Sequence, residues 1–161
     1  TVFADTLGRA YPKHDIDLND LYHFFDCDAG RKFDTLNLCG DYGDCIYYPN
    51  LIELIDQFRS TKRFIIHTAG SHQTDRFWSE LLSRLTEDDM IVFGIDGLED
   101  TNHLYRRRSN WSSIMRAVDL AVQSAAHVRW DTNIFEFNYK HLDKIRAFAE
   151  SRGCEFAAKN S

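Results

Sequence analysis

Short apolar segments alternate along the chain with longer segments in which apolar residues recur every three or four positions. The short segments are rich in Ile, Val and Phe, which is typical of strands that are covered on both faces. They predict five strands, at Phe33–Cys39, Phe64–Thr68, Met90–Asp96, Val128–Phe135 and Glu155–Lys159.

Helical periodicity occupies the intervals between these strands. Each predicted helix carries one apolar stripe, and most of the helices follow a residue that favours a helix N-terminus. The expected helices are Leu18 to Phe25 after a cap at Asp17, Pro49 to Phe58 with Pro49 in the first position, Phe77 to Leu85 after Thr74 or Asp75, Trp111 to Ala125 after Ser109 or Asn110, and Leu142 to Ala149 after Asn138 and before Gly153.

This order, a helix followed by four strand–helix units and a last strand, predicts an α/β domain. Strands that alternate with helices run parallel and are joined by right-handed crossovers. The pattern fits both an open, doubly wound sheet and part of a β/α barrel. The 161 residues are too few for a complete eight-unit barrel, but they suit a single domain over residues 1–161.

The charge balance argues against two kinds of partner. With 19 Lys and Arg residues against 25 Asp and Glu residues, the chain has a net charge of −6. Binding to nucleic acid or to an anionic membrane requires clustered cations, so neither partner is expected. No apolar stretch reaches the ~20 residues that span a bilayer. The first residues lack the pattern of a secretory signal, so we expect a cytoplasmic protein.

The cysteines, at positions 27, 39, 45 and 154, form no C-x-x-C pair. The strongest zinc signature is therefore absent, and without a secretory signal a disulfide framework is not expected. Four unrelated thiols explain the pattern. A cluster site formed by Cys27, Cys39 and Cys45 is the alternative.

Glycines and polar residues follow the predicted strands, where parallel α/β folds bind their ligands. The segments are GDYGDC from Gly40, TAGSH from Thr68 and DGLEDT from Asp96. Glycine lets a backbone approach a ligand closely, and Asp41 or Asp44 could hold an ammonium or hydroxyl group. The alternative is a tight turn followed by helix-capping aspartates.

Other side chains also have two interpretations. His67 and His72 flank a glycine loop and could be metal ligands, although isolated histidines usually are not. Arg106 to Arg108 could bind a phosphate or carboxylate, or form a solvated helix end. No G-x-S-x-G, P-loop or G-x-G-x-x-G motif stands in a suitable place, so hydrolase, NTPase and dinucleotide-binding functions lack support.

Four segments, GDYGDCIYYPNLIELI, IHTAG, VFGIDGLEDTNHLYRRRSNWSSIMRAV and WDTNIFEFN, together resemble radical S-adenosylmethionine enzymes. The resemblance extends from about Phe33 to Lys159 and is most specific in GIDGLEDTNHLYRRRSNW. It implies a partial TIM-like barrel, with a (β/α)6 arrangement of parallel strands. It also implies a [4Fe–4S] cluster that reductively cleaves S-adenosylmethionine to start radical chemistry on a substrate.

The resemblance assigns the methionine part of this cofactor to two segments. Tyr42, Gly43 and Asp44 match the loop that binds the amino group, with Cys45 in place of the usual proline. Arg106 matches a contact to the carboxylate.

Three further positions match the family near the rest of the cofactor. Thr68 opens a T-A-G segment in place of the family's T-N-G. Asp96 matches a position on the ribose or substrate side, and Asn138 matches a polar position near the adenosine. The resemblance thus implies that all three belong to the cofactor-binding site.

The C-x-x-x-C-x-x-C motif that holds three irons of the cluster in this family is missing from the sequence. It should follow the first family strand, so the five predicted strands correspond to strands two to six and the first strand is expected to be absent. We therefore expect the chain as given to hold no cluster, to contain no metal site and to be inactive alone. The substrate, a small molecule or a peptide, and the catalytic residues are not identified.

Two other functions fit the same pattern. A non-catalytic β/α domain could bind a small ligand through Asp41, Asp44 and Asp96. An interaction module could pair with another chain, because a missing first strand would leave an open edge beside residues 36–38 and permit self-association.

Overall fold

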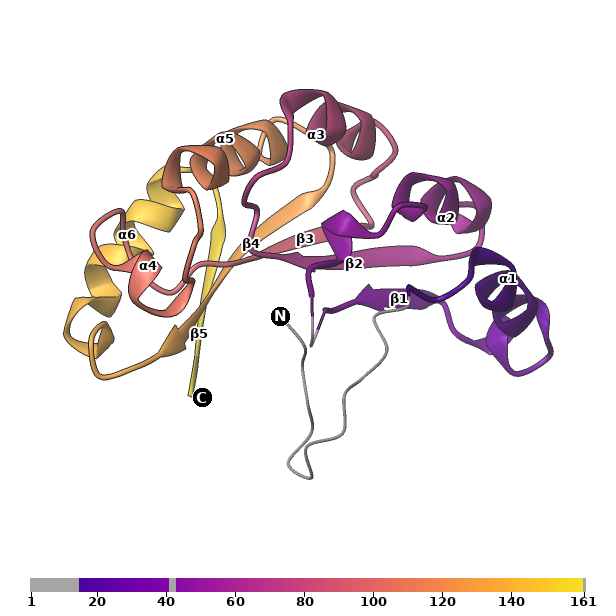
Figure 1. Cartoon of the computed structure of the whole chain (residues 1–161), viewed down its shortest axis with the longest axis horizontal. Coiled ribbons are helices and arrows are strands. Elements are labelled where there is room, and N and C mark those ends of the chain that lie inside the picture. The colour runs from indigo at the N-terminus through magenta and orange to yellow at the C-terminus, as the bar shows by residue number, and fades with distance from the viewer. Residues whose placement is uncertain (1–14, 41–42, 161) are drawn as a thin grey trace.

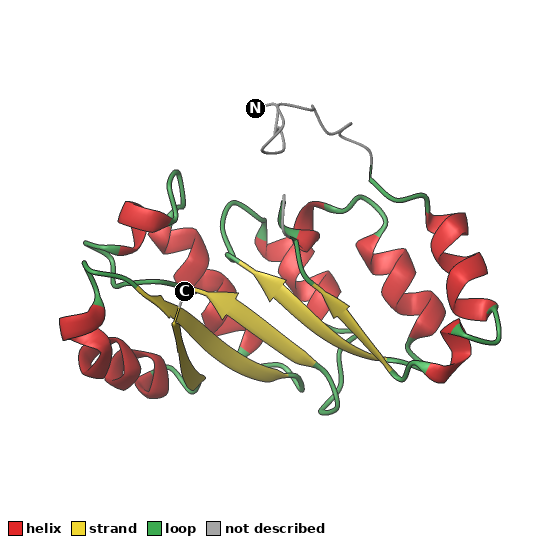
Figure 2. Cartoon of the chain, turned by 90° about the horizontal axis from the view of Figure 1, so that it is seen from below, coloured by secondary structure: helices red, strands yellow, loops and turns green. Residues whose placement is uncertain are grey.

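A five-stranded parallel sheet forms the centre of the protein, as seen in a computed structural model that describes residues 15–40 and 43–160 (Figures 1 and 2). Its strands are β1 (Thr35–Leu38), β2 (Arg63–Thr68), β3 (Met90–Gly94), β4 (His127–Ile134) and β5 (Glu155–Asn160). Neighbouring strands are parallel throughout, and their order in space is their order along the chain. The five predicted strands are therefore confirmed.

The helices lie together on one face of this sheet (Figure 1). A doubly wound sheet reverses its strand order and carries helices on both faces, so the observed order is that of a partial β/α barrel that does not close. Within the described ranges, no helix has the length and hydropathy of a segment that crosses a bilayer. The helices are α1 (Leu18–Asp26), α2 (Leu51–Phe58), α3 (Asp75–Leu82), α4 (Asn102–Tyr105), α5 (Trp111–Ala121) and α6 (Leu142–Ser151).

The hydrophobic core lies between the sheet and the helix layer. Successive side chains of a strand point to opposite faces, so Phe64 and Ile66 of β2 enter the core together with Trp130 of β4. The intervening residues, such as His67 and Arg129, lie on the face that no described helix covers. The strand composition is typical of strands covered on both faces, yet the described helices cover only one face, because every crossover passes on the same side.

Local signals set most helix starts. Side chains at three predicted caps accept hydrogen bonds from backbone N–H groups of the first turn, which confirms them. The helix after Pro49 begins two residues later than expected, at Leu51. Asn138 does not cap α6; its side chain is used elsewhere, as described below. The confirmed caps are Asp17, Thr74 and Asn110, with Asn19, Phe77 and Ser113 as the respective donors.

A buried carboxylate joins three segments at the amino ends of the strands. Asp89, only 5% exposed, accepts a hydrogen bond of 2.7 Å from the backbone N–H of Phe64 in β2. Its other carboxylate oxygen accepts from the N–H and the hydroxyl of Thr86, at 2.8 and 3.1 Å. The backbone carbonyl of Asp89 accepts from the N–H of His127 at the start of β4. One residue thus fixes the entry of β2, β3 and β4.

We expect Asp89→Ala to lower the free energy of unfolding by about 2–3 kcal/mol, because it leaves the buried N–H of Phe64 without an acceptor. The exposed neighbour Asp88 is the matched control, and Asp88→Ala should change stability by less than about 0.5 kcal/mol. Urea denaturation followed by circular dichroism measures both values. Equal effects of the two substitutions would contradict the role assigned to Asp89.

Candidate functional site

A cavity of about 300 Å³ lies at the carboxyl ends of the strands, the edge at which the sequence predicts a ligand. Every strand end contributes to its wall: Cys39 follows β1, Thr68 ends β2, Gly94 ends β3, Asn133 lies in β4 and Lys159 in β5. Residues that are far apart in the sequence therefore line one cavity, because the carboxyl ends of parallel strands lie at the same edge of the sheet.

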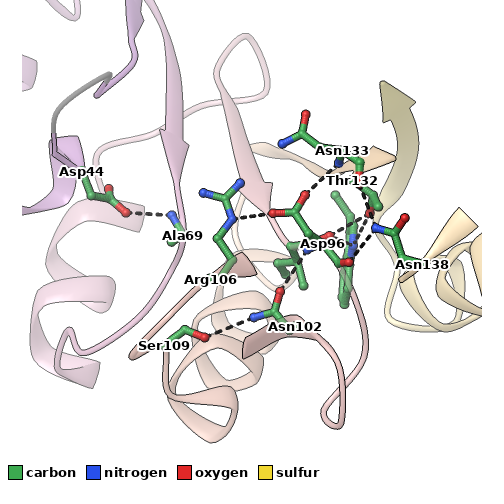
Figure 3. Close-up of polar contacts among 11 residues, drawn as sticks. Asp44, Ala69, Asp96, Asn102, Arg106, Ser109, Thr132, Asn133 and Asn138 are labelled. Atoms are coloured by element: carbon green, nitrogen blue, oxygen red, sulfur yellow. Dashed lines mark hydrogen bonds and ion pairs between the residues drawn. The ribbon is translucent and has the colours of Figure 1, made fainter. Parts of the chain in front are cut away.

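Asp44, in the loop between β1 and α2, is attached to the end of β2. One carboxylate oxygen accepts a hydrogen bond from the Thr68 hydroxyl at 2.8 Å. The same oxygen accepts from the Ala69 N–H at 2.7 Å (Figure 3). The other oxygen accepts a longer bond, 3.3 Å, from the N–H of Ile46. A carboxylate offers about four acceptor positions, and Asp44 lines the cavity, so acceptor capacity remains for a cationic ligand group.

The two glycines of this loop differ in what surrounds them. A Cβ on Gly40 would lie 2.1 Å from the carbonyl oxygen of Gly43, so the tight fold of the loop requires glycine there. A Cβ on Gly43 would meet no atom of the described residues within 4 Å, and Gly43 borders the cavity. Asp41 and Tyr42, which the sequence also proposed for the site, lie outside the described residues.

Arg106, which follows α4, is held by a fully buried carboxylate. Its Nε donates to Asp96 Oδ2 at 2.6 Å, and Asp96 Oδ1 accepts from the backbone N–H of Asn133 at 2.7 Å (Figure 3). A Cβ on Gly94 would lie 2.6 Å from Arg106 Nη2, so glycine at the end of β3 makes room for the guanidinium group. Over residues 15–40 and 43–160, neither Nη has a hydrogen-bond partner, and Arg106 lines the cavity. This leaves a donor fork for an anion.

Asn138 lies behind the cavity and does not line it. Its amide nitrogen donates to the backbone carbonyls of Asp96 and Asn133, both at 2.8 Å, and its oxygen accepts from the N–H of Phe135. The side chain is 1% exposed and connects the ends of β3 and β4. Asn138 and Asp96 therefore support the site from inside, whereas Gly43, Asp44, Thr68 and Arg106 border one cavity.

Sequence reasoning missed a charged group on the open face of β4 and β5. Arg129 Nε lies 2.7 Å from Asp131 Oδ1, and Lys159 forms an ion pair with the other carboxylate oxygen. Asp131 and Lys159 line the cavity together with Asn133. The sequence does contain a signal for this group. In a strand that is expected to be buried, polar residues at every second position indicate that one face of the strand lies outside the hydrophobic core.

His67, on the same open face, also borders the cavity. Burial lowers the pKa of its imidazole; Asp131 opposes this effect, and the charges of Lys159 and Arg129 reinforce it. The ring is therefore neutral at pH 7.

His72 lies apart, with Nε2 at 2.7 Å from the carbonyl oxygen of Arg108, and both of these residues have positive φ, 66° and 64°. In the part of the chain that the structure describes, no three His, Cys, Asp or Glu side chains are placed to hold a metal ion.

The chain resembles solved structures in its fold. One is a domain of pyruvate-formate lyase-activating enzyme from Bacteroides vulgatus ATCC 8482, with a TM-score of 0.53. The likeness covers 78% of this chain and 98% of that one, at 7% sequence identity, and therefore concerns the fold alone. No protein-family model and no curated protein sequence matches this chain.

The cysteines differ in their expected reactivity. Cys45 donates to the carbonyl oxygen of His67 at 3.2 Å, and burial raises the pKa of its thiol to about 12; burial likewise raises the pKa of Cys154 to about 11. Cys27 and Cys39 are exposed. Because the thiolate is the reactive form, we expect an aromatic disulfide reagent at pH 8 to modify Cys27 much faster than the half-buried Cys45 and the buried Cys154.

Mass spectrometry of the modified peptides measures this order, and the denatured chain, in which all four thiols should react, is the control. The rates at Cys45 and Cys154 should rise as the pH approaches their raised pKa values. Modification of Cys45 as fast as that of Cys27 in the native chain would contradict the raised pKa of its half-buried thiol.

Proposed function

We propose that this chain is the body of a radical S-adenosylmethionine domain and that its cavity binds S-adenosylmethionine. The observation that carries the proposal is the meeting of Asp44 and Arg106 at one cavity. A carboxylate and a guanidinium complement the ammonium and carboxylate groups of an amino-acid ligand. The fold likeness to a domain of pyruvate-formate lyase-activating enzyme supports it, since the family resemblance of the sequence implies the same partial-barrel architecture.

Asp44 is suited to an ammonium group because its position is fixed before the ligand arrives. The Thr68 hydroxyl donates to Asp44 and itself accepts from the N–H of Gly70 at 2.9 Å, so this hydroxyl orients the carboxylate. The open space beside Gly43 lets a ligand reach the loop backbone. A preoriented acceptor loses less conformational freedom on binding than a mobile one.

Arg106 is suited to a carboxylate for a similar reason. Asp96 binds only its Nε, so both Nη groups can form a two-pronged contact with a ligand. Asp96 and Asn138 then act as positioning residues and need not touch the ligand. Thr68 is a positioning residue as well, because its hydroxyl is already hydrogen-bonded to Asp44 and to the N–H of Gly70.

Bound S-adenosylmethionine supplies a source of radicals when a reduced [4Fe–4S] cluster lies beside it. The described residues do not fit such a cluster, because no three metal-ligating side chains come together among them. The 161 residues contribute binding and orientation, and we expect them to bind S-adenosylmethionine without cleaving it.

Calorimetric titration of the 161-residue chain with S-adenosylmethionine tests this function. We expect saturable binding that Asp44→Asn and Arg106→Gln each weaken by about tenfold, since each removes one charge-assisted contact. Asp100→Asn and Arg107→Gln remove equal charges at exposed positions that do not line the cavity, and they should leave the affinity unchanged. Absence of saturable binding, or equal losses in the control variants, would contradict the proposal.

The edge of the sheet supports a second proposal, that two copies associate through β1. In the part of the chain that the structure describes, β1 pairs only with β2, and an unpaired strand edge can accept another strand. We expect sedimentation velocity to show a larger species as concentration rises. Asn37→Lys, which places a charge on this edge strand, should reduce association, whereas Gln57→Lys on α2 should not. A concentration-independent monomer would exclude the association.

A further inference from the structure

At the end of the cavity formed by β4 and β5, two positively charged side chains, Arg129 and Lys159, contact one carboxylate, that of Asp131. Arg129 contacts both oxygens of Asp131, at 2.7 and 3.3 Å, and Lys159 forms an ion pair with one of them. The residue Asp131 is 8% exposed, whereas the Lys159 side chain is 51% exposed. Because Arg129 already neutralises Asp131, the charge of Lys159 is not compensated within this group.

Asn133 adds a polar group beside Lys159. The two residues are paired in register on neighbouring strands, so their side chains share the open face. The backbone of Asn133 is hydrogen-bonded to Asp96 and Asn138, but in residues 15–40 and 43–160 its side-chain amide has no hydrogen-bond partner. The side chains of Asn133 and Lys159 both line the cavity. Glu155, which pairs in register with Arg129, does not line it.

This end of the cavity is too far from Asp44 to bind the same chemical group. Asp44 is attached to the end of β2, and Lys159 belongs to β5, three strands away. At a strand spacing of about 4.8 Å, three steps separate the two by about 14 Å. A ligand ammonium at Asp44 therefore leaves Lys159 and Asn133 for another group.

We propose that Lys159 and Asn133 form a subsite for an oxyanion, the carboxylate or phosphate of the substrate, with Asp131 and Arg129 as positioning residues. A compact ammonium with unused donors and a neighbouring amide suit the oxygens of either group. All four side chains stand on strands, which hold them more rigidly than a loop would. The subsite lies beyond the proposed S-adenosylmethionine contacts and identifies the substrate as anionic.

Calorimetric titration of the 161-residue chain with inorganic phosphate and with succinate, at low ionic strength, tests the subsite. We expect saturable binding of at least one probe that persists in Arg106→Gln, which removes the other anion-binding group of the cavity. The probe that binds distinguishes phosphate from carboxylate. Lys159→Gln should weaken binding by about tenfold. Asp131→Asn should strengthen it several-fold, because it removes a competing anion and releases Arg129 as well as Lys159.

Two control variants remove cations elsewhere. Lys32→Gln changes an exposed lysine outside the cavity, and Arg63→Gln changes an arginine of β2 at the amino end of the sheet. Both should leave probe binding unchanged. Circular dichroism of each variant shows whether it is folded, and the half-exposed Lys159 makes Lys159→Gln informative even if Asp131→Asn unfolds.

The outcomes separate the subsite from the S-adenosylmethionine site. Lys159→Gln should leave S-adenosylmethionine affinity unchanged, and Asp44→Asn should leave probe affinity unchanged. Three results would each overturn the proposal. The first is no saturable binding of either probe, and the second is equal weakening in Lys159→Gln and Lys32→Gln, which would indicate an adventitious ion only. The third is weaker binding in a folded Asp131→Asn.

Discussion

The buried carboxylate of Asp96 organises the end of the molecule where the cavity lies. A fully buried carboxylate is costly unless donors surround it, and here Arg106 and the Asn133 N–H supply them. The backbone N–H of Asp96 donates to Asn102, and its carbonyl accepts from Asn138. One residue thereby fixes α4, the end of β4 and the guanidinium that faces the cavity, so the geometry of the site depends on it (Figure 3).

The uncovered face of the sheet is the second constraint. A strand between two helix layers would have to bury both of its faces, and charged side chains could not stand in the middle of it. Because the helices of residues 15–40 and 43–160 lie on one face, the alternate positions of β4 and β5 can carry Arg129, Asp131 and Lys159. The fold thus supplies a rigid polar surface directly beside its own hydrophobic core.

These two features give the cavity an uneven distribution of charge. Asp44 stands at the β1–β2 side, Arg106 near the middle, and the excess positive charge of Lys159 at the β5 side. A ligand that carries both an ammonium and an anionic group, followed by a second anionic ligand, fits this order. The neutral imidazole of His67 borders the same space and can exchange hydrogen bonds without adding charge.

The sequence by itself determined the elements and their order. Strand composition, helix periodicity and caps such as Asp17, Thr74 and Asn110 act within a few residues, so they can be read from neighbours along the chain. The family resemblance also identified Asp44 and Arg106, which the structure brings to one cavity.

Only the tertiary structure decided between a doubly wound sheet and a partial barrel, since that choice depends on the strand order. It also decided that Asn138 supports the sheet ends instead of capping α6, and that Lys159 meets Asp131 across 28 residues of chain. Such contacts arise from the packing of whole elements. Local periodicity carries no information about which distant side chains will share a strand end.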